Sequence, residues 1–325
     1  MTHDQPDHRT PSPWLVQDPL TGRPVFVAPQ RGGKPDDRAL RAAVAAAADP
    51  RDWCPFCAGN ESATPPATIR VPADESLPWR ARIVPNAFPI AAAPGVHDVV
   101  IESSQHHRSI VEVPADTWRE AWALCRERLA GLATRPGIAW ATVFKNSGPA
   151  AGASLEHVHS QLIGLGVVPP VMEAELAAVR RDRGSFARLL AEARSDDRVV
   201  AESGGLVALV PPAARQPYET WIVSAAAEPH VHSAADGQVA ALADLTRELA
   251  ARFERLAPGC QFNWWLHQAP FRTADEDPAV EHWHWHLEVL PRLAELAGFE
   301  IGTGCHITTL APAEAARRLR AAARR

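Results

Sequence analysis

The sequence has a single tyrosine, Tyr218, and no surplus of positive charge: 33 Lys and Arg stand against 38 Asp and Glu, for a formal net charge of −5. A basic surplus usually marks a nucleic-acid-binding chain, so no nucleic-acid partner is expected. No run approaches the roughly 18 consecutive apolar residues that cross a bilayer, so no membrane partner is expected either. Residues 1–8 are polar and lack the apolar core of a signal peptide, which predicts a cytoplasmic protein.

The chain also lacks a disulfide framework, because its five cysteines are odd in number and three of them are widely scattered. The other two, Cys54 and Cys57, stand two residues apart in a turn that contains Pro55. This spacing suits two thiolates on one zinc ion, with imidazoles to complete the four ligands. A redox pair and inert buried cysteines are the alternatives, but no clear strand–helix pattern precedes the pair.

Histidine, in contrast, is abundant, and many of its 14 residues gather at matching points of two similar segments, 97–164 and 218–292. Each segment opens with an apolar run and continues through closely spaced histidines into a long amphipathic helix, predicted at 114–133 and 234–256. A second apolar run follows, and a His-x-His triplet closes each segment. We therefore predict two copies of one α+β unit, each with antiparallel strands, one long helix and a terminal strand that carries chemistry.

The richest segment runs from residue 146 to residue 161. It begins with a loop of small residues whose backbone N–H groups can approach phosphate oxygens. It continues as an alternating strand in which His157, His159 and Gln161 should share one face. A phosphate-binding loop beside imidazoles indicates phosphoryl-group chemistry with histidine as the nucleophile. A polar edge strand is the alternative, and three aligned polar groups after such a loop argue against it.

These motifs resemble the galactose-1-phosphate uridylyltransferase family, a branch of the histidine-triad superfamily in which Gln replaces the third histidine, as Gln161 does here. The resemblance extends from Pro24 to about Arg320. It rests on residues 27–31 with 34, 54–57, 84–89, 100–107, 146–161, 216–219, 267–271, 284–286 and 298–300.

The resemblance implies an α+β fold of two histidine-triad-like units: a catalytic unit with a zinc-binding extension at 1–179, and a second unit at 180–325. It implies a UDP-glucose:hexose-1-phosphate uridylyltransferase that works by ping-pong transfer through a uridylyl-histidine. A nucleotide sugar and a sugar 1-phosphate would be its substrates. Because the family commonly dimerises, a homodimer is also implied.

Site residues follow from the same resemblance, with His159 as the nucleophile. The implied zinc ligands are Cys54, Cys57, His107 and His157. The implied ligands of a second metal, iron or another zinc, are Glu175, His267, His284 and His286. The implied substrate contacts are Gln161, Ser154, Asn146 and Gly152 around the phosphates, Arg31 and Lys34 beside them, Asn86 at the nucleoside, and Phe299 and Glu300 at the sugar. For the second metal cluster, an aromatic core with hydrogen-bonded imidazoles is the alternative, because four tryptophans lie nearby in the sequence.

Three departures from the family pattern concern the choice of base and sugar. Ala87 stands where the best-known members have Asp, Pro212 where they have an aromatic residue, and Phe299 where they have Tyr. Two alternatives therefore stay open. One is an ADP-sugar or dinucleoside-polyphosphate phosphorylase, whose acceptor is inorganic phosphate. The other is a non-catalytic, zinc-organised binding protein, against which the intact His159, Gln161 and loop argue.

The repeat also nominates His286 as a second nucleophile. Its triplet, however, follows an acidic run at 275–277 and precedes Glu288. Carboxylates repel an anionic substrate and attract cations. We therefore expect the second unit to have lost catalysis and to retain a metal or a packing role.

Overall fold

The computed structural model describes residues 13–17, 24–27, 54–272 and 277–323. In these ranges the strands are β1 (Trp14–Gln17), β2 (Pro24–Val27), β3 (Ile69–Val71), β4 (Ala81–Pro85), β5 (Val96–Ile101), β6 (Trp140–Ser147), β7 (His159–Leu165), β8 (Val199–Ser203), β9 (Leu206–Leu209), β10 (Thr220–Ser224), β11 (Phe262–His267) and β12 (His286–Pro291). The α-helices are α2 (Ala115–Thr134), α3 (Pro170–Arg181), α4 (Ser185–Ser195), α5 (Asp236–Leu256), α6 (Gly298–Thr303) and α7 (Pro312–Ala322).

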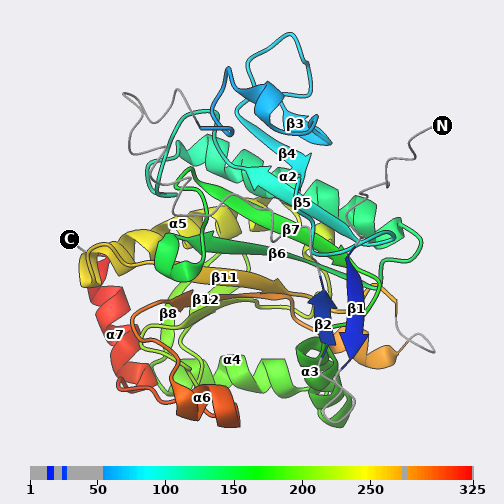
Figure 1. Ribbon diagram of the computed structural model, residues 1–325. Helices are drawn as coiled ribbons and strands as arrows, with labels where there is room; N and C mark the ends of the chain where they lie inside the picture. Colours follow the sequence, from blue (N-terminus) through cyan, green and yellow to red (C-terminus); the bar gives the residue numbers. More distant parts are fainter. Residues whose placement is uncertain (1–12, 18–23, 28–53, 273–276, 324–325) are drawn as a thin grey trace, which may run out of the picture.

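Among the described residues, ten strands form one antiparallel sheet in the order β3-β4-β5-β7-β6-β11-β12-β10-β9-β8, and β1 pairs with β2 separately (Figure 1). The order β4-β5-β7-β6 in the first half recurs as β9-β10-β12-β11 in the second. The halves meet where β6 and β11 pair, with Phe262 opposite Ser147. This topology confirms the predicted α+β fold built from a duplicated unit. The predicted boundary between the units, at 179/180, falls within α3. The sheet is continuous from one half to the other, so the two units share one sheet.

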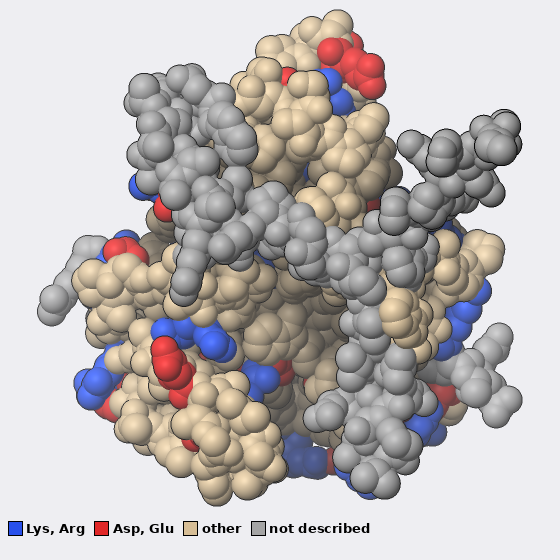
Figure 2. Space-filling view, in the orientation of Figure 1, with Lys and Arg blue, Asp and Glu red and all other residues tan. Residues whose placement is uncertain are grey.

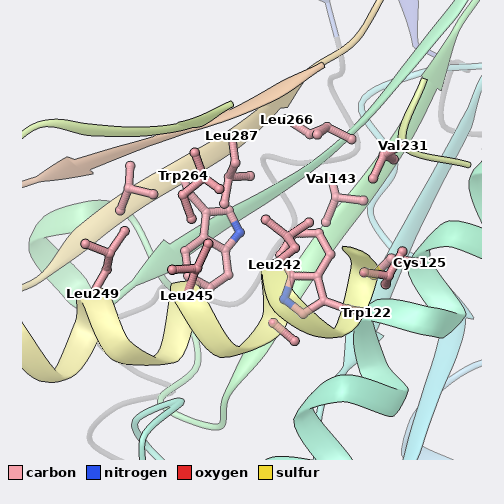
Figure 3. Packing of buried hydrophobic residues seen from close by; sticks show 14 of the residues in the cluster. Trp122, Cys125, Val143, Val231, Leu242, Leu245, Leu249, Trp264, Leu266 and Leu287 are labelled. Carbon is pink, nitrogen blue, oxygen red and sulfur yellow. The ribbon is translucent and has the colours of Figure 1, made fainter. Parts of the chain in front are cut away.

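The two long helices, predicted at 114–133 and 234–256, are α2 and α5, and they cover the same face of the sheet (Figure 1). Their apolar side chains recur at helical spacing, which places them on one stripe of each helix. Figure 3 shows Leu242, Leu245 and Leu249 of α5 packed beneath Trp264 of β11, with Trp122 of α2 beside them. Trp264 is only 1% exposed. Large buried aromatic side chains of this kind dominate the energetics of a core.

The opposite face of the sheet is covered by α3 and α4 (Figure 1). Met172 and Leu176 of α3 and Leu190 of α4 form a second buried cluster with β-strand residues such as Ile163 and Val223.

No helix in the described part of the chain has both the length and the apolar character to cross a membrane. On the face drawn in Figure 2, acidic and basic side chains of the described residues are interspersed, and other residues form most of the middle.

The His-x-His triplets lie at the start of corresponding strands, with His159 first in β7 and His286 first in β12. Contrary to the predicted continuous strand, His157 and His284 precede these strands. The N–H of the intervening Val158 donates to the carbonyl of His107, 2.8 Å away, and therefore does not extend the sheet ladder.

Candidate active site

A cavity of about 610 Å³ opens in the first half of the sheet. Six residues predicted to act in catalysis or to contact the substrate line it together: Asn86, Asn146, Gly152, Ser154, His159 and Gln161. They come from the end of β4, the end of β6, the loop after β6 and the start of β7. Apolar residues complete the walls, among them Phe56, Val84, Phe88, Val99 and Leu155. A cavity of this size, mostly apolar with a few convergent polar groups, is typical of a small-molecule site.

The imidazole of His159 is held in one tautomer. Its Nδ1 lies 2.8 Å from the backbone carbonyl oxygen of His157. A carbonyl can only accept, so Nδ1 carries the proton and Nε2 of the neutral ring carries the lone pair. The ring of Phe56 packs edge-on against this imidazole, with centroids 5.4 Å apart. These contacts fix the direction from which Nε2 can attack.

The loop after β6 is a short 3-10 turn, Pro149–Ala151, between Gly148 and Gly152. Both glycines have positive φ values, 86° and 88°, a conformation that favours glycine. The N–H groups of Ala151 and Ala153 donate to Gly148, that of Gly152 donates to Pro149, and that of Ala150 donates to Gln261. In this structure the backbone N–H groups of residues 150–153, which were expected from the sequence to face phosphate, are therefore engaged within the protein.

Two residues that the sequence did not nominate contact the amides of the site. His97 on β5 places Nε2 2.9 Å from Oε1 of Gln161 and 3.2 Å from Nδ2 of Asn86. Asn263 on β11 places Nδ2 2.7 Å from Oδ1 of Asn146. Only the pairing of β5 with β7 and of β6 with β11 brings these residues together, so no local sequence signal marks them.

Behind the site, on the face of the sheet that α2 and α5 cover, lies a buried ion pair. Lys145 of β6 is paired with Glu102, and its ammonium donates to the backbone carbonyl of His159, 2.7 Å away. Glu102 also accepts a hydrogen bond from Ser160. Burial raises the pKa of Glu102 and lowers that of Lys145, so each charge depends on the other. The pair anchors the first two residues of β7.

The two cysteines of the Cys-x-x-Cys turn converge with two histidines. Nδ1 of His157 lies 3.4 Å from Sγ of Cys54 and 3.6 Å from Sγ of Cys57, and Nδ1 of His106 lies 3.5 Å from Sγ of Cys57. All four ligand atoms lie within 4.8 Å of one another. Burial lowers the pKa of His157 to about 3 and raises that of Cys54. A neutral imidazole and a thiol held close together form a donor set that fits a tetrahedral metal ion.

The fourth member of this cluster is His106, whereas the predicted ligand was its neighbour His107. The ring of His107 points elsewhere: its Nδ1 lies 4.0 Å from Glu112. The N–H of His107 donates to the carbonyl of Gln105 at 2.8 Å, so the two histidines lie in a tight turn. In this turn the ring of His106, and not that of His107, joins the cysteines. The Nε2 of His157 is held by the carbonyl of Ser103 at 2.9 Å, which orients its Nδ1 toward the thiols.

A second cluster lies in the other half of the sheet and comprises Glu175, His267, His286 and Glu288. Nδ1 of His267 lies 2.7 Å from Oε1 of Glu175, and Nε2 of His286 lies 3.9 Å from Oε2 of Glu175. Both Oε2 of Glu175 and Nε2 of His286 are buried, and neither has a hydrogen-bond partner among the described residues. Buried polar atoms are rarely left unpaired, so this donor set fits a cation.

The ionisation of this second cluster supports the same interpretation. Burial acts to raise the pKa of Glu175, but the hydrogen bond from His267 holds it below its usual range. Burial acts to lower the pKa of His267, but Glu175 raises it above its usual range. Without a metal, the two side chains are therefore an ion pair, and a cation would replace the proton between them.

The structure leaves His284 out of this cluster and brings Glu288 into it. Nδ1 of His284 donates to the carbonyl of Ser224 at 2.7 Å, and its ring stacks on Phe186. Glu288 lies two residues beyond His286 on the same strand, so its side chain shares the face that His286 presents. The imidazole of His286 stacks on Trp221, which retains part of the aromatic environment expected from the sequence.

The remaining predicted residues lie away from the cavity or outside the described ranges. Phe299 on α6 is 52% exposed, and Glu300 accepts from the N–H of Ala297 at 3.0 Å; neither lines the cavity. Arg31 and Lys34 lie outside the described residues.

Comparisons with known proteins find relatives that match most of the chain. Residues 94–324 match a family described as a domain of unknown function, DUF4921. The chain is 30% identical to an ADP-glucose phosphorylase of Arabidopsis thaliana over 331 residues, which cover 95% of this chain and 93% of that protein. It is 28% identical over 239 residues to a galactose-1-phosphate uridylyltransferase of Thermotoga maritima, covering 70% of this chain and 74% of that protein.

The fold is similar to a crystal structure of the Arabidopsis ADP-glucose phosphorylase with bound ADP-glucose. The TM-score is 0.76 at 30% identity, and the match covers 95% of this chain and 99% of that chain. The predicted resemblance is thereby confirmed along nearly the whole length. The chain belongs to the galactose-1-phosphate uridylyltransferase-like family of nucleotidyltransferases, within the histidine-triad superfamily.

Proposed function

We propose that this protein transfers a nucleoside monophosphate from a nucleotide sugar to an anionic acceptor through a covalent adduct on His159. The observation that carries the proposal is the fixed tautomer of His159, whose Nδ1 donates to the carbonyl of His157 while the residue lines the cavity. A neutral imidazole with one nitrogen anchored directs the lone pair of the other at a bound phosphorus.

The first step forms a bond between Nε2 of His159 and the α-phosphorus of the nucleotide sugar. The bond from that phosphorus to the bridging oxygen breaks, and the sugar 1-phosphate leaves with the electron pair. In the second step an acceptor phosphate oxygen attacks the same phosphorus, and Nε2 leaves with its lone pair restored. Two displacements on one histidine divide a difficult transfer into two easier steps.

Charge that develops on the non-bridging oxygens needs positioned donors. Asn146, Ser154 and Gln161 line the cavity beside His159 and can supply them. Removing a single donor of this kind typically lowers a rate by about 10²–10³-fold. The predicted contacts of Arg31 and Lys34 with the phosphates remain part of the proposal.

For the substrates, we favour an ADP-sugar as the donor and inorganic phosphate as the acceptor, which makes the protein an ADP-sugar phosphorylase. The relative that matches 95% of the chain is an ADP-glucose phosphorylase. The absence of Asp at position 87 also departs from the best-known uridylyltransferases. Uridylyl transfer to a hexose 1-phosphate is the second candidate, supported by the 28% identity to the Thermotoga enzyme.

Zinc is the metal proposed for Cys54, Cys57, His106 and His157, and it would act as a structural ion because all four positions are taken by the protein. Held in this way, His157 fixes the carbonyl that anchors His159, two residues further along. The cluster of Glu175, His267, His286 and Glu288 is proposed to hold iron or a second zinc, far from the nucleophile in the sheet order.

A homodimer also belongs to the proposal. Phe299 and Glu300 do not line the cavity of their own chain. In the proposed homodimer they contact the sugar bound to the second copy. Size-exclusion chromatography with light scattering tests this part separately.

The proposed reaction is tested by incubating the protein with ADP-glucose, UDP-glucose or GDP-glucose and measuring its intact mass after rapid denaturation. An adenylyl adduct is expected with ADP-glucose. Adding either inorganic phosphate or galactose 1-phosphate to the isolated adduct then identifies the acceptor, because only the correct one discharges the protein quickly. A uridylyl adduct discharged by galactose 1-phosphate would establish the second candidate, and no adduct with any donor would refute both.

A further inference from the structure

Two amide side chains flank the nucleophile, and an amide can present either a donor or an acceptor to a ligand. Asn146 and Gln161 both line the cavity beside His159. If their NH₂ groups face the cavity, they stabilise a phosphate; if their oxygens face it, they repel one. The polarity of these amides therefore decides whether the cavity can bind an anion.

The polarity of Asn146 is set by a backbone carbonyl. Nδ2 of Asn263 lies 2.8 Å from the carbonyl oxygen of Ala151 and 2.7 Å from Oδ1 of Asn146. Because the carbonyl of Ala151 can only accept, the NH₂ group of Asn263 must face it. The second hydrogen of the same NH₂ group then requires an acceptor, which fixes the oxygen of Asn146 toward Asn263. The NH₂ group of Asn146 is thus left on the side of Gly152. A Cβ atom added to Gly152 would lie 3.9 Å from this Nδ2.

The polarity of Gln161 is set by a backbone N–H. The N–H of Ile90 donates to Nδ1 of His97 over 3.2 Å, so the proton of the neutral imidazole must sit on Nε2. Nε2 then donates to Oε1 of Gln161 at 2.9 Å and turns the NH₂ group of Gln161 away from His97. The ring of Phe144 stacks on the imidazole of His97, with centroids 6.5 Å apart, and limits its rotation.

The same tautomer of His97 decides what its contact with Asn86 can be. Its Oδ1 accepts from the N–H of Phe88 at 2.8 Å, so its Nδ2 is the atom 3.2 Å from Nε2 of His97. A ring nitrogen that carries its proton cannot accept from this NH₂ group. The opposite tautomer would let Asn86 donate to His97 but would set the proton on Nδ1 against the N–H of Ile90.

We propose that His97 and Asn263 are positioning residues that force Gln161 and Asn146 to present NH₂ donors to the transferred phosphate. The constraint comes from both halves of the duplicated sheet, since His97 lies on β5 and Asn263 on β11. The inference rests on the proposed function for the identity of the anion, but the tautomer of His97 is a property of the resting protein. Donors fixed before the substrate arrives cost no reorganisation during the reaction.

The tautomer is tested by NMR on protein labelled with ¹⁵N-histidine, with the His97 signals assigned from their loss in His97→Gln. We expect the ¹⁵N shifts of a neutral ring protonated on Nε2. Protonation on Nδ1 would overturn the inference. This measurement needs no substrate, so it tests the tautomer independently of the proposed function. A failure of the proposed function would show instead as the absence of any adduct on the wild-type protein.

The rate of adduct formation in a single turnover tests the consequence. His97→Leu removes the donor and should slow the step about tenfold or more, whereas His97→Gln retains an NH₂ group near the Nε2 position and should recover most of the rate. A residue that only fills space gives no such rescue, and equal rates in the two variants would contradict the assigned role.

At position 263, the isosteric substitution Asn263→Asp should slow adduct formation more than Asn263→Ala does. The carboxylate of Asp can only accept, so it would turn the NH₂ group of Asn146 toward itself and away from the phosphate. A purely structural role predicts the opposite ranking. Gln261→Glu is the matched control: it adds the same charge beside the same loop but retains the acceptor that Ala150 uses. If Gln261→Glu lowered the rate of adduct formation as much as Asn263→Asp does, the effect would come from the added charge alone. That result would overturn the role of Asn263.

Discussion

Gln161 on β7 and Glu288 on β12 occupy the same position in the two halves of the sheet: Gln161 pairs with Phe144 as Glu288 pairs with Trp265. Each lies two residues beyond a histidine whose Nδ1 donates to a backbone carbonyl, His159 in one half and His286 in the other. The two histidines therefore have the same backbone anchor at Nδ1, but their surroundings differ. A neutral amide accompanies His159, whereas two carboxylates accompany His286 and attract a cation instead of a phosphate.

This difference predicts separable effects of substitution in the two halves. His286→Asn should remove about one equivalent of metal and lower the stability, yet leave the adduct on His159 intact, because the two carboxylates of the second cluster suit a metal ion and not a phosphate. His159→Asn is the matched variant and should retain its metal while forming no adduct. Metal analysis and intact mass measure the two effects, and loss of the adduct in a well-folded His286→Asn protein would be evidence against this division.

The repeated order of strands, the two long helices and the residues around His159 could be predicted, because they depend on periodicity and on motifs continuous in sequence. The choice between His106 and His107 could not, since spacing alone does not show which of two adjacent rings turns toward Cys57. His97 and Asn263 were missed because their partners lie 64 and 117 residues away in the chain. Glu288 displaced His284 as a ligand because β12 begins at His286 and leaves His284 before the strand.

The adjacent histidines offer a sharp test of the zinc site. His106→Asn should lose about one equivalent of zinc, as should Cys54→Ser and His157→Asn, whereas His107→Asn should retain it. Structural zinc contributes about 10 kcal/mol or more in small zinc-dependent domains, and the large core here should lessen the effect on folding. Zinc content by mass spectrometry and the melting temperature check the prediction. Loss of zinc in His107→Asn with retention in His106→Asn would reverse the assignment.

The buried pair behind the nucleophile should contribute strongly to stability only as a pair. Lys145→Met leaves Glu102 as an uncompensated buried charge, and breaking such a pair typically costs about 3–5 kcal/mol. Replacing both residues, Lys145→Met with Glu102→Leu, should recover most of that loss, because apolar side chains of similar volume often replace a buried ion pair at little cost. Urea unfolding measures both variants, and a double variant as unstable as the single one would show that the charges act separately.

The pH dependence of stability should contain a contribution from His230. Burial, together with the neighbouring His232, lowers the pKa of His230 to about 4. The unfolded chain binds a proton at this residue below about pH 6.5. Between these values the unfolded state holds more protons than the folded state, so the free energy of unfolding should fall as the pH is lowered.

Urea unfolding of wild type and His230→Gln at about pH 7 and about pH 5 checks this sign, because the two values bracket the unfolded-state pKa. The variant should lose less stability between the two conditions than wild type does. An equal loss in both proteins would show that His230 is not held neutral.

The central claim is that one histidine carries the nucleotide, and the most direct measurement is peptide mapping of the protein trapped with its nucleotide-sugar substrate. The acid-labile adduct should be found on the peptide that contains His159, carrying the nucleoside monophosphate of the donor. A label on the peptide that contains His284 and His286 would show that the two halves of the sheet have the opposite roles.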